Sequence, residues 1–422
     1  MKGTIKCLVF AGLAGLLLSA CQAPSEPLSQ PQQTGQPSES TPVPQAVTGL
    51  VATSNMYGDG DENGFYFKQY QPGHTAALYY ADYKAEKVTV LCSQPNCTHD
   101  SESCTAWLQY EFNLPDVLLC GGKPVLVYRG NPYYYAQGEK AALGSVVVLQ
   151  PNGADPKTLV TFSPSEELDI LYSYDDQGNL YVWKSGLDTK NFAAQKHELL
   201  QIDLQTGESR AVFSVTPKPG ENYFFVGVTD DAFVLKKLAV PENGEVKEPT
   251  HSILLVGTDG TLSEPMMEWE HGELNADWLG GRLFYITEKN ELMVSDFSGG
   301  REKTELVLQS PVMNEMVNYE RCDGDTLFIN STVDENGAAL THRVTYMVDL
   351  REGKLYPADF ANYLEKGQEL QLLSKNGNQY FAALSDGSLS NWDGVLGVRY
   401  GMVDVESNKA GQLVFQPFEV IQ

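Results

Sequence analysis

The chain has 422 residues, and 29 lysines and arginines against 55 aspartates and glutamates give it a formal net charge of −26. Such an excess of acidic residues repels phosphate and argues against nucleic acid as a partner. The hydrophobic content of 42%, with 10% aromatic residues, is enough for a packed core and argues against wholesale disorder. The many glycines and tyrosines favour an all-β chain.

The first residues have the pattern of an export signal. Lys2 and Lys6 precede an apolar run over residues 7–18 that is too short to span a bilayer comfortably. The run ends in Leu18-Ser19-Ala20-Cys21, which resembles the bacterial lipobox, and an ordinary signal peptide that happens to contain a cysteine is the alternative. We therefore predict a lipoprotein signal peptide over residues 1–20 and lipidation of Cys21. Two acyl chains would anchor the protein at the extracytoplasmic face of the cell membrane.

Residues 21–46 differ sharply from the rest of the chain. Six prolines alternate there with Gln, Ser, Thr and Glu, at Pro24, Pro27, Pro31, Pro37, Pro42 and Pro44. Such a segment cannot bury enough apolar surface to fold. At about 3.1 Å per residue in an extended conformation, it would hold a domain tens of ångströms from the membrane.

From Val47 to the end of the chain one structural theme recurs. Its clearest copy has predicted strands at Asp169–Ser173, Leu180–Trp183, His197–Leu204 and Ser209–Ser214, joined by polar, Gly-containing turns. Other copies place the second strand at Phe65–Phe67, Tyr133–Tyr135, Phe233–Leu235, Leu283–Tyr285, Leu327–Ile329 and Tyr380–Ala382.

The second strands begin roughly 45 to 65 residues apart, which is the regime of propeller blades rather than of solenoid repeats. We therefore predict that residues 47–422 form a β-propeller of seven four-stranded blades. Six or eight blades, or two or three β-sandwich domains, are the alternatives.

Several of these features together resemble a known group of proteins. They are the lipobox, the proline-rich tether, the repeats and the segment Leu91-Cys92-Ser93-Gln94-Pro95-Asn96-Cys97-Thr98-His99-Asp100. The chain resembles propeller-type lipoproteins of Gram-positive gut-type bacteria, and its repeats are similar to the receptor-related β-propeller domain class. The resemblance implies a fold and a location but no activity.

Strand direction alternates within a blade, so second-to-third loops and blade-to-blade connections share one face. The long insertions fall in these places, at Lys184–Lys196, Leu238–Thr250, Ser331–Thr341 and Ser385–Gly397. The cysteine-bearing stretch Ser93–Glu111 is expected to be a connection between the first two blades. Long loops on a rigid scaffold commonly bind ligands, so we expect a protein or glycan ligand at this loop-rich face. The alternative is that the face merely tolerates insertions.

The Cys-rich loop at residues 92–120 is the sharpest local signal. Cys92, Cys97, His99 and Cys104 follow the spacing C-x₄-C-x-H-x₄-C, and Cys120 lies further along. Outside the cell, disulfides are the usual fate of such cysteines. Three thiolates and an imidazole also suit tetrahedral zinc. With Cys322 the folded part has an odd number of cysteines, and disulfide, metal and free thiol all stay open.

A possible calcium loop opens the first repeat. Asp59, Asp61 and Asn63 match the start of the pattern D-x-D-x-N-G, but Tyr70 stands where the bidentate glutamate is expected. An ordinary acidic turn is therefore the favoured interpretation, and calcium is a minor alternative.

No nucleophile, zinc-protease or phosphate-loop motif is found in the sequence, so no catalytic residue is predicted. We expect a non-catalytic binding or scaffold module that presents its loop-rich face to a protein, a glycan or a cell-wall ligand. The alternative is an extracellular glycan-active hydrolase or lyase with carboxylates at the propeller funnel. Carboxylates that converge with an arginine or histidine at this mouth would favour the enzyme, and a flat aromatic surface would favour binding.

Overall fold

The computed structural model describes residues 49–53, 57–71, 75–109, 113–139, 143–188, 190, 193–240, 248–270, 274–358, 368–385, 398–404 and 414–421. The predicted signal peptide, Cys21 and the whole of the predicted tether lie outside these residues. Within the described ranges, no helix is long and apolar enough to cross a membrane.

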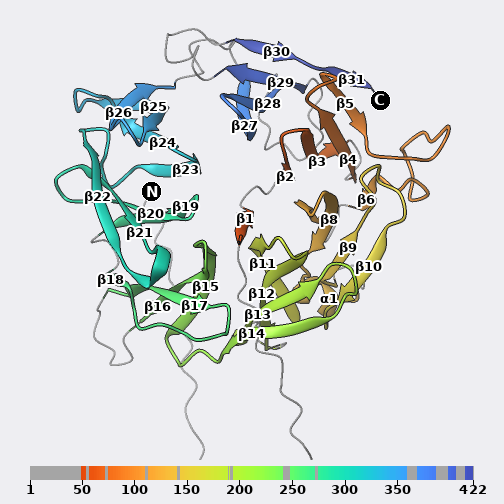
Figure 1. Cartoon of the computed structure of the whole chain (residues 1–422), viewed down its shortest axis with the longest axis horizontal. Helices are drawn as coiled ribbons and strands as arrows, with labels where there is room; N and C mark the ends of the chain where they lie inside the picture. Colours follow the sequence, from red (N-terminus) through yellow and green to blue (C-terminus); the bar gives the residue numbers. More distant parts are fainter. Residues whose placement is uncertain are drawn as a thin grey trace, which may run out of the picture. The chain divides into compact units, whose positions relative to one another are not determined.

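Seven antiparallel sheets follow one another around a central axis, and each is built from four consecutive strands (Figure 1). The prediction of a seven-bladed β-propeller is therefore confirmed. The strands of each blade are given from its inner to its outer edge. Blade 1 consists of β2(Gly58–Gly60), β3(Gly64–Gln71), β4(Thr75–Asp82) and β5(Lys87–Val90); blade 2 of β7(Asp116–Cys120), β8(Lys123–Tyr128), β9(Ser145–Val148) and β10(Lys157–Thr161); and blade 3 of β11(Glu166–Tyr174), β12(Asn179–Leu187), β13(Ala194–Asp203) and β14(Ser209–Val215).

Blade 4 consists of β15(Glu221–Val228), β16(Ala232–Ala239), β17(Thr250–Gly257) and β18(Met267–Glu270); blade 5 of β19(Asn275–Leu279), β20(Arg282–Ile286), β21(Glu291–Asp296) and β22(Lys303–Gln309); blade 6 of β23(Asn318–Asp323), β24(Thr326–Val333), β25(Ala339–Asp349) and β26(Lys354–Pro357); and blade 7 of β27(Glu369–Asn376), β28(Gln379–Ser385), β29(Arg399–Asp404) and β30(Phe415–Pro417).

Three short strands stand outside this scheme. They are β1(Val51–Thr53), β6(Trp107–Gln109) and β31(Glu419–Ile421), which are added to blades 3, 1 and 1 respectively. The described helices are α1(Pro132–Ala136) and the 3₁₀ turn η2(Ser298–Gly300).

Blade 3 forms as the sequence predicted, because its first turn is held by its own side chains. Asp175 accepts hydrogen bonds from the backbone N–H groups of Gln177 and Asn179, at 3.0 and 2.9 Å, and from the Tyr181 hydroxyl. Gly178 has a φ of 86°, a conformation that disfavours any side chain. The turn therefore fixes the register of β11 against β12.

The predicted second strand at Tyr133–Tyr135 is wrong. These residues lie in α1, which starts after Asn131 with Pro132 in its first turn, and the Asn131 side chain accepts a hydrogen bond from the Tyr134 N–H. An Asn cap followed by proline is a helix start, and it prevails over the β-propensity of three tyrosines. The second strand of blade 2 is β8, which runs earlier in the chain.

The core is divided into seven hydrophobic clusters, one at each junction between neighbouring blades. Successive residues of a strand point to opposite faces of its sheet, so they enter different clusters. In β12, Leu180 and Val182 pack toward blade 2, whereas Tyr181 and Trp183 pack toward blade 4. Each second strand contains an apolar run, such as Leu180–Trp183, where both of its faces are buried.

The C-terminal segment closes the ring by pairing with two blades. β30 pairs with β29 of blade 7, and β31, just beyond Phe418, pairs in parallel with β5 of blade 1. The Phe418 ring, 7% exposed, lies between them, 5.7 Å from the ring centre of Phe381. No other pairing between blades 1 and 7 is found among the described residues, so this segment and the aromatic cluster around it join the two blades.

Strand β1 enters the centre of the ring. It pairs antiparallel with β11, the innermost strand of blade 3, with Val51 opposite Tyr174 and Thr53 opposite Tyr172. β11 starts at the face that carries the second-to-third loops, here called the loop-bearing face, so β1 runs toward that face. Gly49, which precedes β1, lies against Asp176 at the opposite face.

We predict that Phe418→Ala lowers the free energy of unfolding by about 3–5 kcal/mol, because removing the ring leaves a cavity in the hydrophobic cluster that joins blades 7 and 1. Val420→Ala, two residues further and 38% exposed, is the matched control. Its effect is expected to stay below about 1 kcal/mol. Urea unfolding monitored by fluorescence measures both changes, and equal effects of the two variants would contradict this role of the segment.

Candidate ligand-binding cavity and Cys/His cluster

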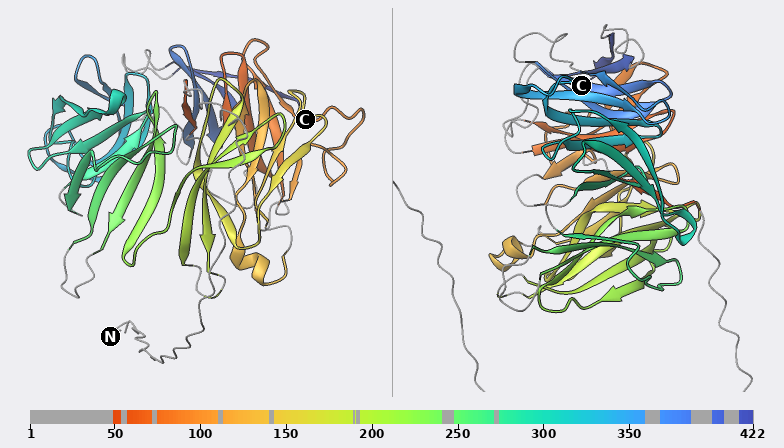
Figure 2. Two further views of the ribbon diagram at one scale, coloured as in Figure 1. Left: turned by 60° about the horizontal axis from the view of Figure 1, so that its bottom comes forward. Right: turned by 90° about the vertical axis from the view of Figure 1, so that its left-hand side faces the viewer.

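A cavity of about 760 Å³ lies on the loop-bearing face, among blades 1 to 4. Its walls come from the end of β3, the segment between β8 and α1, the adjoining ends of β11, β12 and β13, and the start of β15. All of these segments lie at the same ends of their strands. α1 projects from this face beyond the strands (Figure 2).

Lys68, which lines the cavity, belongs to a buried ion pair. The ammonium group of Lys68 in blade 1 lies 3.2 Å from Asp116 in blade 2, and both side chains are less than 10% exposed. The Tyr172 hydroxyl of blade 3 donates to the second Asp116 oxygen at 2.8 Å, and Arg129 lies 3.6 Å from it. Burial lowers the pKa of Lys68, which the negative charge of Asp116 opposes. One carboxylate therefore ties three blades together.

A second polar group stiffens the wall formed by blades 3 and 4. The buried His197 ring stacks on Trp183, with ring centres 5.4 Å apart. Its Nδ1 lies 2.9 Å from the Ser185 hydroxyl, and its Nε2 lies 2.9 Å from the Asn222 side-chain oxygen. Burial lowers the pKa of His197, which favours the neutral ring, and both of its nitrogens are engaged in hydrogen bonds.

Two carboxylates line the cavity from one strand. Glu167 and Asp169 both lie near the start of β11 and line the cavity. Burial raises the pKa of both groups; the negative charge of Asp169 further raises that of Glu167, while the positive charge of Arg129 lowers both. The two acids are therefore harder to ionise than exposed acids.

The loop-bearing face differs in detail from the sequence prediction. Lys184–Lys196 is mostly strand, because β12 extends to Leu187 and β13 begins at Ala194, and Ser331–Thr341 shortens in the same way between β24 and β25. Most of the other two insertions lies outside the described residues. The cavity is formed mainly by strand ends rather than by long loops.

The cysteine-bearing stretch does not connect blades 1 and 2 as expected. β5 and β6 both pair with β4, β5 along Tyr79–Asp82 and β6 along Thr75–Ala77. They are two pieces of one outer strand, and the cysteine loop, residues 91–106, emerges from the gap between them. The loop is thus an insertion in the edge of blade 1.

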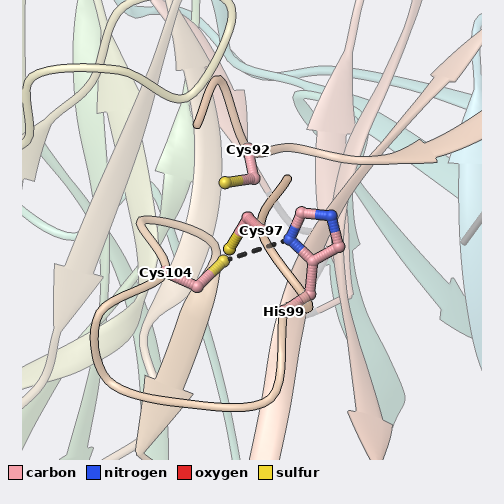
Figure 3. Close-up of side chains that lie close together, drawn as sticks. All are labelled: Cys92, Cys97, His99 and Cys104. Atoms are coloured by element: carbon pink, nitrogen blue, oxygen red, sulfur yellow. Dashed lines mark hydrogen bonds between the residues drawn. The ribbon is translucent and has the colours of Figure 1, made fainter. Parts of the chain in front are cut away.

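The loop brings four of the predicted residues together. The sulfur atoms of Cys92, Cys97 and Cys104 and a ring nitrogen of His99 all lie within 4.8 Å of one another (Figure 3). His99 Nδ1 is 3.3 Å from the Cys104 sulfur. Cys120 is not part of this cluster, because it ends β7 and is buried between blades 2 and 3. The five described cysteines all have free thiols.

The residues of the predicted calcium loop have other partners. One Asp59 oxygen accepts from the N–H of Leu119 in blade 2 at 3.0 Å, and burial raises the Asp59 pKa to about 6. Asp61 accepts from the N–H groups of Asn63 and Gly64. Asp61 thus stabilises the turn between β2 and β3, and Asp59 stabilises the contact with blade 2.

No protein-family model and no curated protein matches the chain. Similar solved structures include the β-propeller domain of the Trilobed protease from Pyrococcus furiosus, with 11% identity, a TM-score of 0.49 and coverage of 88% of this chain and 96% of that one. The WD40 domain of SCAP from fission yeast has 12% identity, a TM-score of 0.39 and coverage of 89% and 88%. The acylaminoacyl peptidase of Pyrococcus horikoshii has 11% identity, a TM-score of 0.43 and coverage of 72% and 46%, so this chain spans about half of its length. The activities in these names are not transferred to this chain.

We predict that Asp116→Ala lowers the free energy of unfolding by about 3–5 kcal/mol, because it leaves the Lys68 ammonium group buried without a counter-charge. Combining it with Lys68→Met should recover most of this loss. The exposed pair of Lys303 and Glu305 provides the control, since Glu305→Ala should cost less than about 1 kcal/mol. A double-mutant cycle from urea unfolding measures these values, and additive effects of the two substitutions would contradict the coupling.

Proposed function

We propose that the protein is a lipoprotein of the cell membrane, anchored at the extracytoplasmic face through Cys21, whose propeller binds a glycan without converting it. The observation that carries this proposal is the polar cavity on the loop-bearing face. Its volume of about 760 Å³ lies within the range of small-molecule sites, about 300–1,000 Å³.

The chemistry of the lining suits a ligand rich in hydroxyl groups. Lys68 and Arg129 supply donors, and Glu167 and Asp169 supply acceptors. A sugar hydroxyl both donates and accepts, so it can satisfy groups of either kind. A strongly anionic ligand would instead be repelled by the two carboxylates.

The lining also has apolar surface for the faces of sugar rings. Ile170 and Phe224 border the cavity and are 39% and 38% exposed, and Tyr70 lines it on the blade 1 side. Asp116 holds Lys68 and Arg129 in place, and His197 is held by its bonds to Ser185 and Asn222. A preorganised site loses less conformational entropy when it binds its ligand.

A glycan-active hydrolase or lyase is the second candidate, because Glu167 and Asp169 line the cavity together with Arg129 and His197, which is the arrangement expected of an enzyme from the sequence, and both acids have raised pKa values. Such groups are suited to acid–base catalysis near neutral pH. Two observations favour binding. Both His197 nitrogens are engaged in hydrogen bonds, and Arg129 is paired with the buried Asp116 carboxylate.

We predict that the detergent-purified protein retains specific oligosaccharides on a glycan array, and that Asp169→Asn weakens their binding by at least about tenfold. A charged hydrogen bond contributes about 1.5–3 kcal/mol, which corresponds to that factor. Glu305→Gln, on the exposed outer strand of blade 5, should leave binding unchanged. Absence of any glycan ligand, or equal effects of the two variants, would contradict the site.

The same glycans distinguish the two candidates. After prolonged incubation with the protein, mass spectrometry should recover them intact. Cleavage by the wild-type protein that Glu167→Gln abolishes would instead establish the enzyme and contradict the non-catalytic role.

We predict that Cys21→Ala abolishes lipid attachment, so the protein loses the mass of the diacylglycerol group and leaves the membrane fraction of a bacterial host. Cys7→Ala, in the apolar run of the signal, is the matched control and should be lipidated normally. Fractionation and intact-protein mass spectrometry measure the outcome. Membrane retention of the Cys21→Ala protein with an unchanged acyl mass would contradict the anchor.

A further inference from the structure

The cysteine loop sits at an unusual place for a long insertion. It leaves blade 1 after β5 and returns at β6, and both strands pair with the same β4. Cys92 lies two residues after the end of β5, and Cys104 lies three residues before β6. A link between these two cysteines would therefore join the ends of the interrupted strand.

The four side chains in the loop have the composition and spread of a metal site. Three thiols and one imidazole place their ligand atoms within 4.8 Å of one another. In a tetrahedral zinc site, bonds of about 2.3 Å to sulfur and 2.0–2.1 Å to nitrogen separate the ligand atoms by about 3.5–3.8 Å. The 3.3 Å between His99 Nδ1 and the Cys104 sulfur is already close to this spacing.

The backbone of the loop is shaped around the sulfur atoms. Asn96 and His99 have φ values of 56° and 59°, so the chain reverses sharply on either side of Cys97. The N–H groups of Gln94 and Ala106 point at the sulfurs of Cys92 and Cys104, at 3.5 and 3.4 Å. Hydrogen bonds of this kind stabilise thiolates and orient metal ligands.

We propose that Cys92, Cys97, His99 and Cys104 bind one structural Zn²⁺ ion, which joins the two pieces of the outer strand of blade 1. Four protein ligands complete a tetrahedral shell and leave no position for a substrate, so the site is structural rather than catalytic. The thiolate-rich donor set disfavours calcium and magnesium, which require oxygen ligands. Each thiol gives up its proton as it binds the ion.

A disulfide would engage only two of the four converging side chains. Pairing two of its three sulfur atoms would leave the third sulfur and the imidazole next to each other without a function. The remaining described cysteines cannot complete a second pair at this place, because Cys120 ends β7 and Cys322 lies in β23 of blade 6. Zinc engages all four converging groups.

The ion would also stabilise the junction between blades 1 and 2. Cys104 and Ala106 are buried in the cluster that contains Leu78 of blade 1 and Leu126 of blade 2. Fixing Cys104 through the metal holds this part of the loop in the core. Removal of the ion should therefore lower the stability of the propeller and not only release the loop.

The test uses the full-length protein, purified under reducing conditions with zinc present, and its metal content measured by elemental mass spectrometry. We expect one zinc per chain in the wild type and in Cys322→Ser, whose sulfur lies outside the cluster. His99→Ala and Cys97→Ser, at partly exposed positions, should contain almost none. A zinc chelator should lower the melting temperature of the wild type and of Cys322→Ser, but not that of His99→Ala.

Other outcomes would overturn the proposal. One is wild-type protein without stoichiometric zinc that also fails to take up added Zn²⁺. Another is a disulfide among Cys92, Cys97 and Cys104, found by peptide mapping of a separate preparation that is purified without reductant and alkylated before any reduction. A third is unchanged zinc content in His99→Ala and Cys97→Ser. Substitution with Co²⁺ adds a readout independent of stability, since a tetrahedral thiolate site gives visible absorption that the His99→Ala protein should lack.

Discussion

The structure depends on one constraint: each four-stranded sheet has two apolar faces, and only neighbouring sheets can cover both. Successive residues of a strand therefore enter the clusters on its two sides, as Tyr181 and Val182 do in blade 3. Seven such clusters close a ring only if the last sheet also packs against the first. The C-terminal segment meets this requirement by pairing with blade 7 through β30 and with blade 1 through β31, while Phe418 fills the cluster between them.

Polar groups are placed where this apolar packing ends. At the loop-bearing ends of blades 1 to 4, the clusters give way to the Asp116 ion pair and the bonds of His197, which are buried enough to be rigid. Lys68 and His197 line the cavity there. The residues that line the cavity are supported by the same blade junctions that stabilise the fold, and β1 runs toward the cavity from the opposite face.

The sequence was sufficient for the architecture because strands buried on both faces leave a strong apolar signal. Runs such as Leu180–Trp183 recur at the spacing of blades, and the turn at Asp175 specifies its own geometry. The prediction failed at Tyr133–Tyr135, where an Asn cap and Pro132 start a helix despite three residues with high β-propensity. Local capping decided the structure there.

The candidate sites were predictable to different degrees. Cys92, Cys97, His99 and Cys104 are close in sequence, so their convergence could be anticipated, although not their position inside an interrupted strand. The cavity could not be predicted, because Lys68, Arg129, Asp169 and His197 come from three blades. The one available signal was the presence of charged and polar residues within apolar strands, as with Asp116 and His197. This signal does not show which of these residues contact one another.

Hydrogen exchange of the intact protein, followed by mass spectrometry, tests most directly whether the seven blades form one cooperative ring. The amides of β3 and β28, on the two sides of the closing segment, should exchange as slowly as those of β12 and β16, and all should be released only by global unfolding. Much faster exchange of β3 and β28, with β12 and β16 still protected, would contradict the account, because blades 1 and 7 would then separate while the rest of the ring stays folded.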